Sequence, residues 1–165
     1  MEMNFVHTNA FASIIKTETQ LMHYQKNNAT AEVVRLVAME SKPFGSVCEK
    51  IIGEILSLGP RMSTQNDASY KGKKIEIKTA RYWSGKNDCK WQHIEKDHDY
   101  DYVLFALLGY TGFNIWGTSK ESLFKHEGTL LKKQGKQGYW VKKSDIAGYC
   151  TLITSKEDLD VALGV

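Results

Sequence analysis

One apolar run constrains the fold of this chain more than any other feature of the sequence. It is the longest uninterrupted apolar stretch, the seven residues from Tyr102 to Leu108, and it continues to Tyr110 before a turn at Thr111 and Gly112. The run is too short to cross a bilayer, which takes about 20 apolar residues. Its length and composition are typical of a β-strand buried on both faces. We therefore expect a sheet at the centre of the protein, with covering layers on both sides.

The rest of the sequence supplies helices first and then strands with interspersed helices. Helix-favouring residues dominate segments 8–24 and 29–40, and Phe44 to Leu58 has the three-and-four spacing of an amphipathic helix that ends at Gly59-Pro60. Further strands are predicted at 67–70, 73–80, 113–118 and 149–154, short helices at 121–125 and after Ser155, and a helix or loop at 88–98. The predicted fold class is α/β, with a mixed central β-sheet flanked by helices and a helical N-terminal region.

Composition narrows the class of protein further. The chain has 165 residues, of which 42% are hydrophobic, so it is long enough for one domain with a sizeable core and too apolar to be disordered. The three cysteines, at 48, 89 and 150, are too few and too far apart for a disulfide framework or a four-cysteine zinc site. We expect reduced thiols, no secretory signal, no membrane segment and a cytoplasmic location.

The net charge of +3 conceals two basic segments. Residues 71–91 contain seven basic and two acidic side chains, and residues 120–143 contain the same numbers, so each segment has a net charge of +5. The remainder of the chain therefore has a charge of 3 − 10 = −7. If both segments lie on one face, that face attracts a polyanion. The alternative is two lysine-rich surfaces that are simply solvated.

The segment from Gln65 to Arg81 contains the most informative group of residues. Glu76 and Lys78 are two positions apart on a predicted strand, so their side chains point the same way with roots roughly 7 Å apart. A hairpin through Lys71-Gly72 brings Asp67 beside Glu76. Two carboxylates suit Mg²⁺, and a neighbouring lysine can orient or deprotonate an attacking water. This grouping points to phosphodiester hydrolysis, whereas Glu76 and Lys78 taken alone are better explained by a solvated strand face.

The run Asn66-Asp67-Ala68 followed by Glu76-Ile77-Lys78, after a helix that bears acidic residues, resembles the PD-(D/E)xK nuclease superfamily. It is particularly similar to small type II restriction endonucleases, over roughly Phe44 to Thr118. The resemblance implies a restriction-endonuclease-like fold. In that family the Asp and Glu bind a divalent metal, and the residue between Glu and Lys contributes a main-chain carbonyl. The Lys acts on the attacking water.

Transferred to this chain, the resemblance implies that Asp67, Glu76 and Lys78 are catalytic, and that Asp67, Glu76 and Ile77 bind Mg²⁺. The acidic residue that the family has on its helix corresponds best to Glu49, in Gly45-x-x-x-Glu49, with Glu54 as second choice. The proline that precedes the family's Asp is replaced here by Asn66.

Residues near this group are candidates for DNA binding. The basic flank provides phosphate contacts and comprises Lys71, Lys73, Lys74, Arg81 and Lys90. Arg81 can read guanine or contact a phosphate, Gln92 can pair with adenine, and His93 can reach a phosphate. Trp83 follows the strand that bears Glu76 and Lys78 and could enter a groove of the DNA. The alternative to a DNA-binding role for Trp91 and His93 is that Trp91 is a core residue and His93 a surface residue. Tyr139 and Trp140 either stack on DNA or belong to a hairpin packed on the core.

These observations predict a single nuclease domain over 1–165, with a helical region (1–42), a catalytic core (43–118) and a basic C-terminal part (119–165). The expected activity is Mg²⁺-dependent cleavage of double-stranded DNA at a short specific sequence, as in a type II restriction endonuclease, with no small-molecule cofactor. One active site cuts one strand, so we expect a homodimer, with residues 1–42 as its interface. The alternatives are a repair or junction-resolving nuclease of the same fold, and a non-catalytic DNA-binding module.

Overall fold

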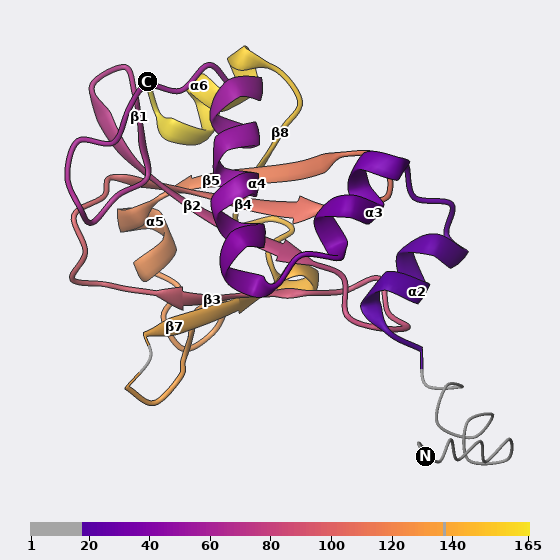
Figure 1. Cartoon of the computed structure of the whole chain (residues 1–165). Helices are drawn as coiled ribbons and strands as arrows, with labels where there is room; N and C mark the ends of the chain where they lie inside the picture. The colour runs from indigo at the N-terminus through magenta and orange to yellow at the C-terminus, as the bar shows by residue number, and fades with distance from the viewer. Residues whose placement is uncertain (1–17, 137) are drawn as a thin grey trace, which may run out of the picture.

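A mixed five-stranded sheet forms the centre of the protein (Figure 1). The computed structural model describes residues 18–136 and 138–165. The strand order is β1-β2-β4-β5-β8, in which β2 and β4 are parallel and every other neighbouring pair is antiparallel. The strands of this sheet are β1 (Ala68–Tyr70), β2 (Lys73–Arg81), β4 (Tyr102–Leu108), β5 (Phe113–Ser119) and β8 (Thr151–Ile153). The expected α/β class with a mixed sheet is confirmed.

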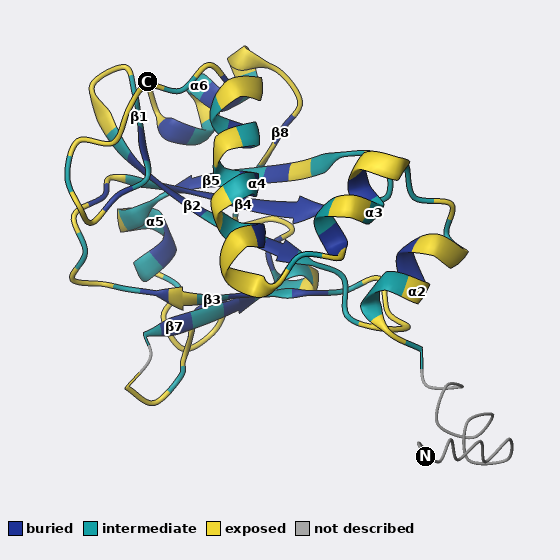
Figure 2. Cartoon of the chain, in the orientation of Figure 1, coloured by how far each residue is buried: buried dark blue, intermediate teal, exposed yellow. Residues whose placement is uncertain are grey.

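A layer covers each face of this sheet. Helices α4 (Ser41–Ile55) and α6 (Lys156–Leu163) pack on one face through a core that includes Ile52, Ile75 and Leu159. The other face is covered by a second, three-stranded sheet and by α5 (Lys120–Phe124). That sheet has the order β3-β7-β6, formed by β3 (Lys90–Ile94), β7 (Tyr139–Lys142) and β6 (Lys132–Lys133), and the short helix η1 (Lys143–Asp145) follows it. Figure 2 shows mainly exposed and intermediate positions on the side of α4 that is turned away from the sheet.

The apolar run at 102–110 forms β4, the central strand of the main sheet. Residues 103–108 are fully buried, because β4 lies between β2 and β5 and under a covering layer on each face. The strand ends at Leu108, two residues before the predicted end, and Tyr110 lies in the turn that follows it. The sequence correctly predicted that this strand is buried on both faces.

Helix α4 begins earlier than its apolar pattern indicated. The prediction started at Phe44, whereas the helix starts at Ser41 and contains Pro43 in its first turn, where a missing N–H removes no helical hydrogen bond. Phe44, Cys48 and Ile52, each four residues apart, form its buried face. The helix ends at Ile55, and Ser57 with a φ of 52° takes the chain away from it before Gly59-Pro60.

Two short helices, α2 (Gln20–Lys26) and α3 (Ala31–Val37), precede α4. Thr19 and Thr30 cap them, and each threonine side chain accepts a hydrogen bond from a backbone N–H in the first turn. Both were predicted as longer helices, and residues 8–17 of the first prediction lie outside the described residues. A buried hydroxyl attaches α2 to the core: the Tyr24 OH donates to the Leu108 carbonyl and accepts from Tyr82 N–H.

The prediction of a helix or loop at 88–98 was wrong in part, because residues 90–94 form strand β3. Trp91 and Ile94 are both buried, and the register shifts between them at a β-bulge. The bulge breaks the two-residue alternation that identifies a strand from sequence. The Trp91 indole N–H donates to the Ala106 carbonyl at 3.0 Å, so this tryptophan is a core residue.

The remaining predicted elements are present with small shifts in their ends. Ser119 caps α5, which begins one residue before the predicted helix at 121–125. Ser155 caps α6, as the sequence indicated, and β8 is shorter than predicted. Within residues 18–136 and 138–165, no helix has the length and apolar character needed to span a membrane.

Candidate active site

A tight hairpin places Asp67 beside Glu76. Strands β1 and β2 are joined by Lys71 and Gly72, whose positive φ values of 48° and 77° are those of a two-residue type I′ turn. The register pairs Ala68 with Ile75, and a hydrogen bond joins the carboxyl groups of Asp67, the preceding residue, and Glu76. The hairpin inferred from the sequence is therefore confirmed.

Backbone hydrogen bonds fix Asp67 at the point where β1 begins. Its N–H donates to the Ile75 carbonyl at 2.9 Å, and its Oδ2 accepts from Ile77 N–H at 2.8 Å. The buried Asn66 side chain holds the preceding loop, since it accepts from Met62 N–H and donates to Ser63 Oγ and the Asp99 carbonyl. Asn66, which replaces the proline expected from the family, thus holds the loop before Asp67 in place.

The carboxyl group of Glu76 lies in an environment that disfavours its charge. Glu76 is only 7% exposed. Burial, and next a hydrogen bond with the Asp67 carboxyl, raise the pKa of Glu76 from 4.5 to about 9, against an opposing effect of Lys78. A hydrogen bond between two carboxyls requires that one of them holds a proton. A cation in place of that proton would let both groups ionise.

Glu49 approaches the same group from α4. Burial, and then the Asp67 carboxylate, raise the pKa of Glu49 to about 7, while the Lys78 ammonium lowers it. Glu49 also raises the pKa of Glu76. The structure therefore brings the four predicted catalytic residues together, with Asp67 before β1, Glu76 and Lys78 on β2, and Glu49 on α4. Glu54, the second choice for the helix acid, is exposed.

The oxygen donors around Asp67 and Glu76 suit Mg²⁺, which keeps several water ligands, better than a metal ion whose ligands are all protein side chains. In the part of the chain that the structure describes, no three His, Cys, Asp or Glu side chains are already arranged as a metal site. Mg²⁺ needs only one or two carboxylates, because water and substrate phosphate complete its coordination. The N–H and C=O of one strand residue point to the same side, so the Ile77 carbonyl faces the Asp67 edge. Asp67, Glu76 and the Ile77 carbonyl thus form a suitable set of oxygen donors.

Arg81, a candidate for reading guanine, makes structural contacts. One of its guanidinium nitrogens, Nη1, donates to the carbonyls of Val37 and Met39 at 2.7 and 2.8 Å, and the group stacks 4.5 Å from the centre of the Phe44 ring. These contacts join the end of α3 to the start of α4. Arg81 also lines the groove described below, so its role in DNA binding stays a prediction.

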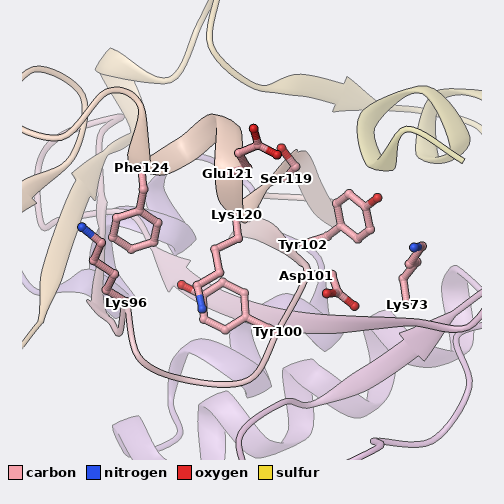
Figure 3. Close-up of a pocket in the computed structure, with 9 residues that line it drawn as sticks. All are labelled: Lys73, Lys96, Tyr100, Asp101, Tyr102, Ser119, Lys120, Glu121 and Phe124. Atoms are coloured by element: carbon pink, nitrogen blue, oxygen red, sulfur yellow. The ribbon is translucent and has the colours of Figure 1, made fainter.

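The lysines of the predicted basic flank are dispersed. Lys71 pairs with Asp160 and Lys74 with Asp99, each at 2.8 Å. Lys73 lines a hollow of about 510 Å³ at the start of β4 (Figure 3). Asp67, Glu76, Lys78 and Glu49 do not line this hollow, so Lys73 and the hollow lie apart from the carboxylate group.

The other predicted DNA-binding residues gather around one groove. This groove, of about 370 Å³, lies between the start of α4 and β3, and its lining includes Trp83, Lys90, Gln92 and His93. Thr79, the residue after Lys78, lines the same groove, so the groove adjoins β2. His93 is exposed and has a φ of 56° at the bulge of β3, a strained conformation that is common at functional positions. Ser41 and Thr79 also line the groove and were missed, because only the fold brings them there.

The Asp97-to-Asp101 run, which has an acidic pattern suggestive of a metal site, is a turn. Asp99 pairs with Lys74, and Asp101 accepts from Lys74 N–H. These carboxylates connect the start of β2 to the segment before β4.

Comparison with known proteins adds no relative: no protein-family model matches the chain, and no curated protein is significantly similar to it.

Proposed function

We propose that this protein is a magnesium-dependent type II restriction endonuclease with a restriction-endonuclease-like fold, which hydrolyses phosphodiester bonds at a short specific sequence in double-stranded DNA. The observation that carries the proposal is the proximity of Asp67, Glu76, Glu49 and Lys78, whose charges shift the pKa values of Glu49 and Glu76. Three mutually repelling carboxyls and a lysine are unfavourable in a purely structural role, whereas a bound cation would satisfy them.

Each side chain has a distinct role in this proposal. Asp67 and Glu76 would bind the metal together with the Ile77 carbonyl, and Glu49 would bind a water molecule of the metal. The metal, when bound, supplies a more acidic water and neutralises charge on the phosphate. Lys78 orients the attacking water and stabilises the charge that develops as the P–O bond of the leaving group breaks.

The groove supports duplex DNA as the substrate. Lys90 and His93 can contact phosphates, and the amide of Gln92 can pair with an adenine edge in the major groove. In the structure Gln92 Oε1 accepts from Gln134 Nε2 at 3.1 Å, which fixes the orientation of the Gln92 amide. The Gln92 amide N–H₂ is a donor that a base acceptor can use.

Digestion of a panel of substrates tests this class of nuclease against its alternatives. Plasmid and phage DNA are incubated with Mg²⁺ or with EDTA, beside branched and flapped duplexes. The proposal predicts discrete fragments from plasmid and phage DNA, in Mg²⁺ only. Cleavage restricted to branched or flapped substrates would instead identify a structure-specific nuclease. Binding without cleavage of any substrate would identify a DNA-binding module.

A further inference from the structure

The second sheet carries a group of lysines around a tryptophan on the face that points away from the core. Trp91, Tyr139 and Val141 are buried on its inner face. Side chains alternate along a strand, so the residues beside them face outward. These outward residues, which we call the lysine–tryptophan face, are Lys90, Lys132, Trp140 and Lys142.

The strand register brings these four side chains into contact. Lys90 is paired directly with Lys142, and Lys132 with Trp140. The Nζ atoms of Lys90 and Lys132 lie 5.4 and 5.3 Å from the centre of the Trp140 ring. Lys142 Nζ lies 5.8 Å from the Trp83 ring centre. Cation–π attraction therefore holds three ammonium groups over two indole rings.

The positive charge of this face is not neutralised by neighbouring acids. Ion pairs among the described residues involve other basic side chains, and none includes Lys90, Lys132 or Lys142. Two like charges directly opposite on adjacent strands destabilise a sheet. An anion bound across them would relieve that repulsion, so the arrangement favours a partner with regularly spaced negative charges.

The lysine–tryptophan face adjoins the groove beside the candidate active site. Lys90 and Trp83 belong both to this set of contacts and to the groove lining, which also includes Thr79, next to Lys78. In Figure 1, β3 passes beside the start of α4, and residues of both elements line this groove. A long polyanion in the groove would therefore continue over the lysine–tryptophan face.

We propose that the lysine–tryptophan face is a docking surface for the phosphate backbone of double-stranded DNA. Lys90, Lys132 and Lys142 contact phosphates, and Trp140 keeps Lys90 and Lys132 directed outward and packs against the sugar edge. The choice of DNA as the polyanion rests on the proposed nuclease function. The contacts are independent of sequence, and they hold the duplex in register with the groove.

Salt-dependent binding tests this surface. A fluorescent 24-base-pair duplex of mixed sequence is titrated by anisotropy in EDTA, where no metal-dependent cleavage occurs, over a range of KCl concentrations. The variant Lys132→Ala/Lys142→Ala is compared with Lys125→Ala/Lys156→Ala, which removes two exposed lysines outside this face and the groove. Each lost phosphate contact lowers the slope of log K against log salt by about 0.9, so the first variant should lose about 1.8. The control should match the wild type.

Each result decides the proposal. An unchanged slope in Lys132→Ala/Lys142→Ala, equal loss in both double variants, or no duplex binding by the wild type would overturn it. Thermal unfolding checks that the variant is folded, and Lys132→Gln/Lys142→Gln replaces it if it is not. Magnesium-dependent cleavage is measured separately on the wild type. Cleavage with an unchanged slope would reject only this surface, whereas a reduced slope without cleavage of any substrate would reject only the nuclease.

Discussion

The buried position of Glu76 determines the protonation state of its carboxyl group. It is buried beside Asp67, and its pKa is raised to about 9 because burial and the neighbouring carboxyl favour the protonated form. At neutral pH Glu76 is therefore largely protonated in the absence of a cation. Magnesium would replace the proton, so metal affinity should increase with pH.

The raised pKa predicts a specific pH dependence of stability. The native state holds the Glu76 proton more tightly than the unfolded chain does, so its contribution is complete below about pH 4.5 and is lost as pH rises towards 9. The slope reaches at most about 1.4 kcal/mol per pH unit. In metal-free buffer, Glu76→Gln should therefore lose less stability than the wild type between pH 6 and 8, as measured by urea unfolding. Glu54→Gln, at an exposed position, serves as the control, and parallel pH profiles for all three proteins would contradict the interpretation.

Magnesium should reverse this loss at the same residue. A ligand that binds only the native state raises the free energy of unfolding, by about 2.7 kcal/mol at 100 times its dissociation constant. We expect Mg²⁺ at pH 8 to raise the melting temperature of the wild type, and to raise that of Glu76→Gln much less. An equal increase in both proteins would show that the ion binds elsewhere.

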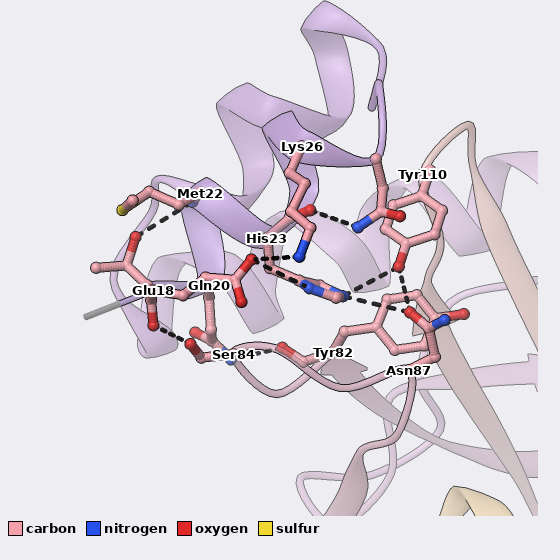
Figure 4. A network of polar contacts seen from close by, with 11 residues as sticks. Glu18, Gln20, Met22, His23, Lys26, Tyr82, Ser84, Asn87 and Tyr110 are labelled. Carbon is pink, nitrogen blue, oxygen red and sulfur yellow. Dashed lines mark hydrogen bonds and ion pairs between the residues drawn. The ribbon is translucent and has the colours of Figure 1, made fainter. Parts of the chain in front are cut away.

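At the scale of elements, the attachment of α2 depends on one buried hydroxyl. Tyr24 is fully buried, and its OH connects the Leu108 carbonyl at the end of β4 to Tyr82 N–H after β2. His23 beside it contacts the Tyr110 hydroxyl at 3.0 Å and Asn87 at 3.3 Å (Figure 4). These contacts link the N-terminal helix to the loop that carries Trp83.

Removing the Tyr24 hydroxyl should therefore destabilise the protein. Tyr24→Phe leaves a backbone donor and an acceptor without their partner in a buried site, at a cost of about 1–3 kcal/mol. Urea unfolding measures this loss, and Tyr149→Phe, at a position 44% exposed, should change stability by less than about 0.5 kcal/mol. Similar values for the two variants would mean that the hydroxyl is not a structural anchor.

The elements with strong local signals were predictable from the sequence. β4 and the buried face of α4 follow from hydrophobic pattern, and the β1–β2 hairpin follows from Lys71-Gly72 between alternating residues. β3 was missed because a bulge at Gln92-His93 interrupts its alternation, and its partner β7 lies about 50 residues further along the chain. Long-range pairing of that kind leaves no local pattern.

The candidate site was predictable where it is local and unpredictable where it depends on the fold. Asp67, Glu76 and Lys78 lie on one hairpin, so their spacing indicated their proximity. The roles of Arg81, Lys71 and Lys74 depend on distant partners such as Val37, Asp160 and Asp99, which a basic segment in the sequence does not reveal. The lysine–tryptophan face likewise requires the pairing of β3 with β7.

For the whole molecule, the proposed double-strand cleavage requires two active sites. The exposed faces of α2 and α3 are mostly polar, and Met22 is the only large exposed hydrophobic residue on these two helices. An interface formed by residues 1–42 would therefore have to be polar or include residues 1–17, which the structure does not describe. We predict that light scattering gives a protein mass of twice 18.7 kDa when duplex DNA is present, after the mass of the duplex is subtracted. A mass of one chain throughout would argue against paired cleavage and favour a nicking or structure-specific enzyme.

The rate of magnesium-dependent plasmid cleavage by Lys78→Ala tests the central claim most directly. Lys73→Ala is the matched control, because it removes the same charge from the same strand at an exposed position that does not face the carboxylates. The account predicts that the wild type cuts supercoiled plasmid in Mg²⁺ but not in EDTA, that Lys78→Ala loses at least about 100-fold in rate, and that Lys73→Ala retains most of it. Magnesium-dependent cleavage that is equally fast in Lys78→Ala and the wild type would contradict the assignment of this site.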